Sequence, residues 1–408
     1  MNYVRNEMPY LPLSKKRRGP TREQPLQSKF IFYNYFLILS RAYRDIPQSV
    51  DKAAMQARHR PFSGRRNPCT ARLSRHRFVT LAAVGASTPP TAVYTTKHTL
   101  PDGKNLELLV QRAARSTSSS SPRPPLLFVH GSYHAAWCWQ ENFMPYFASR
   151  GYDTYAVSLR AQGGSDPAPL GQSVAGTLDL HASDLATLVP AVQQSSSAAN
   201  GSSGAGRAPV IIGHSFGGLI VQKYILSTAK SGTPAPPPAP GAAPAPGAFP
   251  PLSGAAFLCS VPQSGNQQMI VRFLLRDPIM SFKLTWGFIA RSFATSREAC
   301  RELFFSKDVP QDKLEMYQKL LAAASPTRLI DLKDMNAQVP LPPPPAHAPP
   351  AFVLGGADDT VVDPQAVKEL ASYYGIKDIL LQGVAHDCML DTRWERAASE
   401  LEAWLATL

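Results

Sequence analysis

Hydrophobic and polar positions follow two alternating patterns between residues 91 and 408. Short apolar or β-branched runs have the length of strands, and between them lie longer segments with apolar residues every three or four positions. Strands that alternate with helices predict βαβ units, and therefore an α/β fold with a mostly parallel sheet and helices on both faces. We expect strands at 92–100, 105–112, 126–129, 152–157, 210–212, 255–260, 351–354 and 379–381. We expect helices at 137–150, 179–192, 219–229, 364–374 and 392–405.

One long segment, from Gln268 to Leu332, interrupts this alternation. It has a helical pattern and many large apolar side chains, and it follows an expected strand. An insertion at the carboxyl edge of the sheet would lie over a site formed there, so we expect a helical cap at about residues 262–336. An apolar cap favours apolar acyl substrates, although most of these side chains can equally form the core of the cap itself.

Ser-, Gly- and Pro-rich runs separate several of the expected elements. Because loop length affects stability only weakly, they are interpreted as lengthened loops rather than domain boundaries. We therefore expect one folded domain over residues 91–408. The runs are 116–125, 195–206, 233–251 and 340–350.

The net charge of +13 belongs to the amino-terminal part of the chain. The first 98 residues carry 18 Lys and Arg and four acidic residues, whereas the remainder carries 24 and 25. A nucleic-acid-binding protein would present basic patches on its folded body, so we expect no nucleic-acid partner. Residues 1–90 are expected to form a basic, disordered leader.

The composition of this leader indicates a targeting role. No acidic residue occurs between Lys52 and Pro101, and the Arg-rich, Ser-containing sequence from Met55 is typical of an organellar transit peptide. We expect an organellar location, chloroplast first, and one hypothesis places the true start at Met55. The alternative is an untargeted basic extension of a cytoplasmic protein.

Two further features exclude classes of protein. The apolar run from Phe30 to Leu39 is shorter than the roughly 20 residues that a spanning helix needs, so no transmembrane segment is expected. The five cysteines are scattered without the spacing of a metal site or a disulfide framework. We therefore expect no metal and no other cofactor.

The candidate nucleophile lies in the motif G-x-S-x-G, from Gly213 to Gly217. A β-branched run precedes the motif and an apolar-periodic segment follows it, which is the strand–turn–helix context of a nucleophile elbow. A serine on such a sharp turn adopts a strained backbone, and the flanking glycines leave room where a Cβ would clash. Ser215 is therefore the predicted nucleophile.

A serine hydroxyl needs a base, and the base needs a carboxylate that orients it. The elbow fold supplies these groups in the chain order Ser, acid, His. His386 follows an expected strand, and so it is the predicted base. The segment from Gly356 to Val362 matches the form G-x-x-D-x-V-V, which favours Asp359 as the acid over its neighbour Asp358.

Together these motifs resemble the α/β-hydrolase superfamily over about residues 91–408. The stretch from His130 to Trp139 is similar to the H-G-x-x-H-x-A-W-x-W form of the plant methylesterase and hydroxynitrile lyase branch. The stretch from Arg160 to Ser165 resembles the R-G-x-G-x-S loop of that family, with Ala161 in place of its usual Gly. The resemblance implies the α/β-hydrolase fold with a helical cap and an esterase- or lipase-like activity.

The same resemblance implies further site residues. An oxyanion hole would consist of the backbone N–H groups of Phe216 and of Ser132 or Tyr133. Four neighbouring residues are expected to line the substrate pocket: His130, Gly131, His134 and His214. For His134, a helix-capping role is equally open.

The predicted reaction is the hydrolysis of carboxylic esters, lipid esters included, through an acyl-enzyme. We expect small-molecule or lipid ester substrates and peripheral contact with membranes. An acyltransferase or thioesterase is one alternative, based on the H-x4-D pattern that ends at Asp391, a residue equally suited to a helix N-cap. A non-catalytic ligand-binding protein on the same fold is another. Lyases of this fold carry a Lys after the base, where this chain has Asp387.

Overall fold

The structure is a computed structural model that describes residues 87–116, 123–199, 206–230 and 248–408. The chain divides into two units, Met1–Arg77 and Phe78–Leu408, and every described residue belongs to the second. The predictions of a disordered leader over residues 1–90, of a transit peptide and of a start at Met55 concern residues that, apart from 87–90, lie outside the described part, and they stay predictions.

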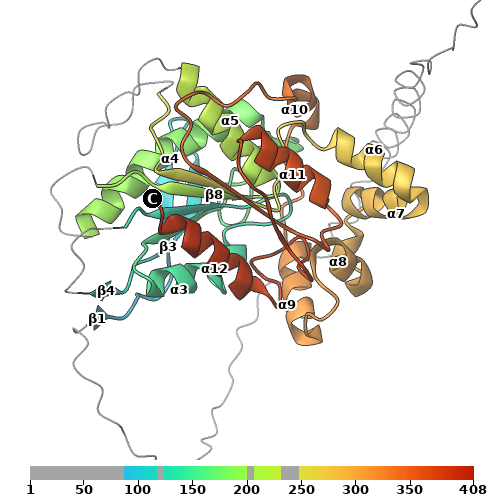
Figure 1. Ribbon diagram of the computed structural model, residues 1–408, viewed down its shortest axis with the longest axis horizontal. Coiled ribbons are helices and arrows are strands. Elements are labelled where there is room, and N and C mark those ends of the chain that lie inside the picture. Colours follow the sequence, from blue (N-terminus) through green and yellow to red (C-terminus); the bar gives the residue numbers. More distant parts are fainter. Residues whose placement is uncertain (1–86, 117–122, 200–205, 231–247) are drawn as a thin grey trace, which may run out of the picture. The chain divides into compact units, whose positions relative to one another are not determined.

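A sheet with helices on both sides forms the centre of the second unit (Figure 1). It has eight strands, in the order β12-β11-β9-β8-β5-β6-β3-β2. Neighbouring strands pair in parallel except where β3 meets β2 and β6. The predicted α/β class with a mostly parallel sheet is confirmed. The strands are β2 (Tyr94–Thr99), β3 (Asn105–Gln111), β5 (Leu126–Val129), β6 (Thr154–Val157), β8 (Val210–His214), β9 (Gly254–Leu258), β11 (Ala351–Gly356) and β12 (Ile379–Leu381).

Both faces of this sheet are covered, because successive side chains of a strand point to opposite faces. In β5, Leu126 and Phe128 pack into the core with α3 (Phe143–Ser149) and α12 (Trp394–Leu405). Leu127 and Val129 pack into the core on the other face, which three further helices cover. Two buried faces require continuous apolar runs, which is why the central strands lack a polar alternation. The other helices are α4 (Leu178–Ala199), α5 (Phe216–Lys230) and α11 (Pro364–Tyr373).

Two helices differ from their predicted bounds by more than three residues or in number, whereas α5, α11 and α12 differ by one to three residues at an end. The helix expected at 137–150 is two helices, α2 (Trp137–Gln140) and α3. The helix expected at 179–192 runs on to Ala199, through Pro190 and into the predicted Ser-rich loop. Tertiary contacts account for this extension, because Ser196 is buried and donates a hydrogen bond of 2.8 Å to the Asp153 carboxylate.

Most of the predicted cap segment is helical. Its short strand β10 (Arg328–Ile330) pairs in parallel with β7 (Val174–Gly176), and neither strand is long enough to be recognised from its pattern. Two more short strands, β1 (Ser87–Thr88) and β4 (Arg115–Ser116), pair with each other. The helices between β9 and β11 are α6 (Gln267–Arg276), α7 (Pro278–Ile289), η2 (Ser292–Ala294), α8 (Arg297–Phe304), α9 (Gln311–Ala322) and α10 (Leu332–Gln338).

Loops at the carboxyl ends of the parallel strands meet along one edge of the sheet. The loops after β5, β8, β11 and β12 carry the predicted oxyanion segment, nucleophile, acid and base. In an open α/β sheet this edge is where ligands bind. None of the helices in the described part of the chain has both the length and the apolarity needed to cross a bilayer.

Candidate active site

Ser215 occupies the tight turn between β8 and α5. Its φ of +54° lies in the left-handed region, which an L-residue adopts only at a cost in free energy. The turn is close-packed, since a Cβ on Gly213 would lie 2.6 Å from Gly218 Cα and a Cβ on Gly217 would collide with the carbonyl of His130. The two glycines of the motif are therefore required by backbone contacts.

His386 and Asp359 lie together, although 27 positions separate them. His386 Nδ1 lies 2.8 Å from Asp359 Oδ2, and both side chains are buried. The other oxygen, Asp359 Oδ1, accepts hydrogen bonds from the backbone N–H groups of Val361 (2.7 Å) and Val362 (2.9 Å). Since a carboxylate accepts, Nδ1 donates, which leaves Nε2 to take up a proton. The alternative acid, Asp358, is exposed, so the geometry favours Asp359.

The surroundings of His386 act on its pKa in opposite directions. Burial favours the neutral imidazole, but the charge of Asp359 and the hydrogen bond to it favour the imidazolium, with a further contribution from the charge of Asp387. The net result is a pKa above the usual 6.5. The environment of His386 therefore stabilises the positive charge that forms on its imidazole when it accepts a proton.

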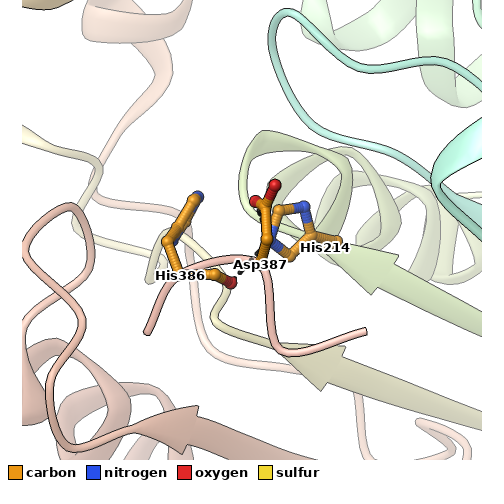
Figure 2. A group of neighbouring side chains, drawn as sticks. All are labelled: His214, His386 and Asp387. Carbon is orange, nitrogen blue, oxygen red and sulfur yellow. Dashed lines mark hydrogen bonds and ion pairs between the residues drawn. The ribbon is translucent and has the colours of Figure 1, made fainter. Parts of the chain in front are cut away.

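His214 connects the nucleophile turn to the base (Figure 2). Its Nε2 donates a hydrogen bond of 3.0 Å to the backbone carbonyl of His386, and the two ring centroids lie 4.7 Å apart. Burial holds the pKa of His214 well below its usual value, so the ring is neutral. The residue that precedes Ser215 therefore positions the loop that carries His386.

The predicted oxyanion segment is a tight turn against the nucleophile. His134 N–H donates to the carbonyl of Gly131 at 3.4 Å, and Tyr133 has a φ of +65°. A Cβ on Gly131 would lie 2.6 Å from Ser215 Cβ and 3.1 Å from its Oγ. Phe216 is the first residue of α5, where a backbone N–H has no partner within the helix. Ser215 is thus flanked by the two segments from which the predicted N–H donors come.

The two histidines of this turn bind the backbone. His130 Nδ1 donates to the Gly131 carbonyl (2.7 Å), and its Nε2 accepts from the N–H of Leu159 (2.9 Å). Burial lowers the pKa of His130 to about 3. His134 Nδ1 donates to the Ser132 carbonyl (2.9 Å), and its ring does not cap α2, whose N-cap residue is Ala136. Whether these rings also line a substrate pocket stays a prediction.

Aromatic side chains connect the turn to the cap. Tyr133 Oη donates to the carbonyl of Phe288 in α7 at 2.8 Å, and its ring lies 4.8 Å from that of Phe293. Phe304 is buried, with its ring centroid 6.3 Å from that of His386. Part of the predicted apolar cap therefore packs on the site, whereas other large apolar side chains of the cap, Ile279 among them, are exposed.

Asp387 is the polar site residue that sequence reasoning missed. The side chain is fully buried, and its Oδ2 lies 2.8 Å from His134 Nε2. The sequence offered one signal, an acidic residue directly after the predicted base, which served only as evidence against a lyase. Its partner comes from a segment 253 positions earlier, and no local pattern reveals such a pairing.

His214, His386 and Asp387 each place one nitrogen or oxygen within 4.8 Å of the others. Three such atoms could approach one metal ion. However, His214 Nε2 is bound to the His386 carbonyl and His386 Nδ1 to Asp359, which leaves His386 Nε2 as the atom that a base uses. The donor set therefore fits a hydrogen-bonded catalytic group better than a metal site.

Comparison with known proteins places the chain in a family. The model described as "Alpha/beta hydrolase family" matches residues 126–400. A soluble variant of monoglyceride lipase from Saccharomyces cerevisiae is similar in structure, with a TM-score of 0.51, 15% identity, and coverage of 77% of this chain and 95% of that one. For an esterase from Exiguobacterium antarcticum the values are 0.50, 14%, 77% and 100%.

At these identities the likeness to the solved structures concerns the fold alone. No curated protein matches the sequence. The family model, in contrast, covers more than half of the chain, and it includes the nucleophile turn and the loops of the acid and the base. The chain belongs to the alpha/beta hydrolase family.

Proposed function

We propose that the protein is a serine hydrolase that cleaves carboxylic esters through an acyl-enzyme. One observation carries the proposal: Ser215 has the backbone of a nucleophile elbow, and the loop beside it holds an imidazole whose Nδ1 lies 2.8 Å from a buried carboxylate. Nucleophile, base and orienting acid are the three groups that acyl transfer by serine requires.

In the proposed reaction, His386 Nε2 takes the proton of Ser215 Oγ while the oxygen attacks the ester carbonyl. Backbone N–H groups of Phe216 and of Ser132 or Tyr133 stabilise the oxyanion, where one such donor is worth about 100- to 1,000-fold in rate. The imidazolium then returns the proton to the leaving alcohol. A water molecule then attacks the acyl-enzyme by the same steps, which releases the carboxylic acid and restores Ser215.

The substrates that we propose are esters with an apolar acyl group, lipid esters included. Aromatic side chains of the cap pack around the turn that holds Tyr133, and Phe304 contacts the ring of the base. An apolar lining with few polar groups is suited to hydrocarbon chains.

The acyltransferase alternative depended on Asp391, which has a structural role here. Its Oδ2 accepts weak hydrogen bonds from the N–H groups of Ser306 (3.3 Å) and Ala385 (3.4 Å), and its Oδ1 accepts from that of Arg393 (3.1 Å). These bonds hold the loop that carries His386, and they account for a buried Asp391 without a transferase reaction. No contact in the described residues favours transfer over hydrolysis.

The test compares the full chain with Ser215→Ala. We would measure turnover of p-nitrophenyl esters from acetate to palmitate, and of glycerolipids with a lysolipid acceptor present. Ser227→Ala is the matched control, because this serine is also buried but lies further along α5. We expect activity and fluorophosphonate labelling in the wild type and in the control, and neither in Ser215→Ala.

Equal turnover by the wild type and Ser215→Ala would refute the acyl-enzyme mechanism. Absence of both turnover and labelling in the wild type would favour the non-catalytic ligand-binding alternative. Acyl transfer to the lysolipid faster than release of free acid would replace hydrolysis with transfer as the main reaction.

A further inference from the structure

Two histidines outside the predicted triad connect the three loops of the site. His214, on the nucleophile turn, donates to the backbone carbonyl of His386. His134, on the oxyanion turn, lies 2.8 Å from the carboxylate of Asp387, the next residue. The backbone N–H of Asp387 donates to the Phe304 carbonyl at 2.9 Å. The base loop is thus bound to the nucleophile turn, the oxyanion turn and the cap.

The protons of the His134–Asp387 pair follow from its partners. The Ser132 carbonyl can only accept, so His134 Nδ1 carries a proton. The contact between His134 Nε2 and Asp387 Oδ2 then contains one further proton, whichever atom holds it. The pair is therefore neutral as a whole, which is the arrangement that a fully buried carboxylate requires.

The carboxylate of Asp387 also lies close to the base, with one oxygen within 4.8 Å of a ring nitrogen of His386. Asp387 Oδ1 has no hydrogen-bond partner among the described residues, and it lies 3.8 Å from His214 Nε2 (Figure 2). His214 is neutral and cannot compensate a charge there. Although the pair is neutral as a whole, its carboxylate end is the part that lies within 4.8 Å of a ring nitrogen of His386. The carboxylate therefore adds to the effect of Asp359 on the imidazole.

The remaining groups around the two residues are uncharged. His386 is packed against His214 and Phe304 in addition to Asp359. Three titratable neighbours have a raised pKa, chiefly from burial and in part from the charge of Asp387, so each of them stays neutral. They are Cys138, Cys300 and Tyr317. His134 is thus the group that can balance Asp387.

We propose that Asp387, held by His134, is a positioning residue for the catalytic base. It fixes the loop of His386 to the oxyanion turn, and it places a second carboxylate beside the imidazole to stabilise the imidazolium during acyl transfer. The inference deepens the proposed function, because it assumes that His386 is the base of that reaction.

The experiment uses three variants of the full chain. Asp387→Asn removes the carboxylate and keeps the shape of the side chain. The double variant His134→Phe/Asp387→Leu replaces the pair by apolar groups of similar size, a change that buried ion pairs often tolerate, and it serves if the single variant does not fold. Asp153→Asn is the control, since Asp153 is also buried and paired but lies at the amino end of β6, away from the site.

Two measurements separate positioning from packing. The first is the pKa of His386 from histidine NMR, with its signal assigned by its loss in His386→Gln. The second is kcat/KM for a p-nitrophenyl ester as a function of pH. We expect a lower pKa of His386 in Asp387→Asn and in the double variant, and kcat/KM about 10- to 100-fold lower on the plateau above that pKa, since small misplacements of a catalytic group have such effects. Asp153→Asn should match the wild type in both.

An unchanged pKa of His386 in either folded variant would overturn the proposal, whatever happens to kcat/KM. Wild-type kcat/KM in either folded variant would overturn it too. If the wild type itself has no turnover, the proposed function fails, whereas the NMR titration still decides whether Asp387 acts on His386.

Discussion

At the scale of single residues, the site depends on backbone conformations that L-residues rarely adopt. Ser215 and Tyr133 have positive φ, and so does Ala161. The first two lie in the nucleophile and oxyanion turns, where such strain serves to aim a catalytic group. Ala161 lies in the Arg160–Ser165 loop at the position where the resembling family usually has Gly, and its φ of +57° explains that preference.

Ala161→Gly is therefore expected to stabilise the protein. Glycine removes the strain of a left-handed alanine, roughly 1–2 kcal/mol, and loses part of that gain through the greater freedom of the unfolded chain. We expect the free energy of unfolding to rise by about 0.5–1 kcal/mol in denaturant titrations. Ala113→Gly, at a buried alanine without positive φ, should instead destabilise; equal effects at both positions would contradict the explanation.

A second prediction at this scale concerns Asp359 and pH. Only the neutral imidazole accepts a proton, so the raised pKa of His386 places the acid limb of kcat/KM above pH 6.5. In Asp359→Asn the charge is lost and the imidazole tautomer is wrong, so the limb should move to lower pH and kcat should fall by about 10,000-fold. Asp358→Asn is the control, with an exposed side chain. A larger loss in the control would identify Asp358 as the acid.

At the scale of elements, the sequence predicted the parts of the fold that local patterns determine. β5 and β12 have the expected bounds, because each is a short apolar run. The predicted end of α4 was wrong because side chains distant in sequence bury its last turns. Strands β7 and β10 were not predicted, because a strand of three residues shows no periodicity. For the same reason the Ser215, His386 and Asp359 positions could be proposed from motifs, whereas the pairing of Asp387 could not.

The cap has an exposed apolar face for which we propose an anionic lipid surface as the partner. Leu275 and Ile279 are 79% and 84% exposed, and the exposed rings of Phe282 and Trp286 in α7 stack on each other. Arg276, in the last turn of α6 next to Leu275, is an exposed cation. Apolar and aromatic groups next to cations are typical of helices that bind at the membrane interface.

Ile279→Ser/Phe282→Ser should therefore weaken binding to vesicles that contain an anionic lipid by about tenfold or more, from the apolar area lost. The control is Met316→Ser/Leu320→Ser, which changes two exposed apolar residues of α9. Turnover of a soluble short ester should be unchanged in both. Equal binding by both double variants would contradict the proposal, and a dimer lost only with Ile279 and Phe282 would identify a second copy as the partner.

At the scale of the whole molecule, buried neutral histidines affect the response to acid. Burial lowers the pKa of His130 to about 3, of His181 to about 4, and of His214 well below its usual value. The unfolded chain takes up these protons below about pH 6.5, so stability falls as the pH drops from there toward the folded-state values.

Between pH 7 and pH 5 the free energy of unfolding should decrease by about 2 kcal/mol for each of these histidines. Denaturant titrations at the two pH values measure the decrease. His181→Gln keeps a donor for the Leu329 carbonyl and should make the decrease smaller by one such increment. The same pH dependence in His181→Gln and the wild type would show that this ring is not buried in its neutral form.

We propose that the basic leader directs the protein to an organelle, chloroplast first. The charge supports this, because the residues after position 98 carry nearly equal numbers of basic and acidic side chains, whereas those before it are strongly basic. Amino-terminal sequencing of the native protein should find a mature chain that lacks most of the first 90 residues. A mature chain that retains Tyr33 would contradict both import-linked cleavage and a start at Met55.

The order of strands and loops has a consequence for how the sequence can change over evolution. The runs rich in Ser, Gly, Pro or Ala at 116–125, 195–206 and 233–251 each precede the amino end of a parallel strand in the sequence. The Pro-rich run at 340–350 does the same for β11. The loops that carry Ser215, Asp359 and His386 leave the opposite ends of the strands. Loops at one rim of the sheet can therefore be lengthened or shortened without altering the catalytic residues at the other rim, so the two rims can evolve at different rates.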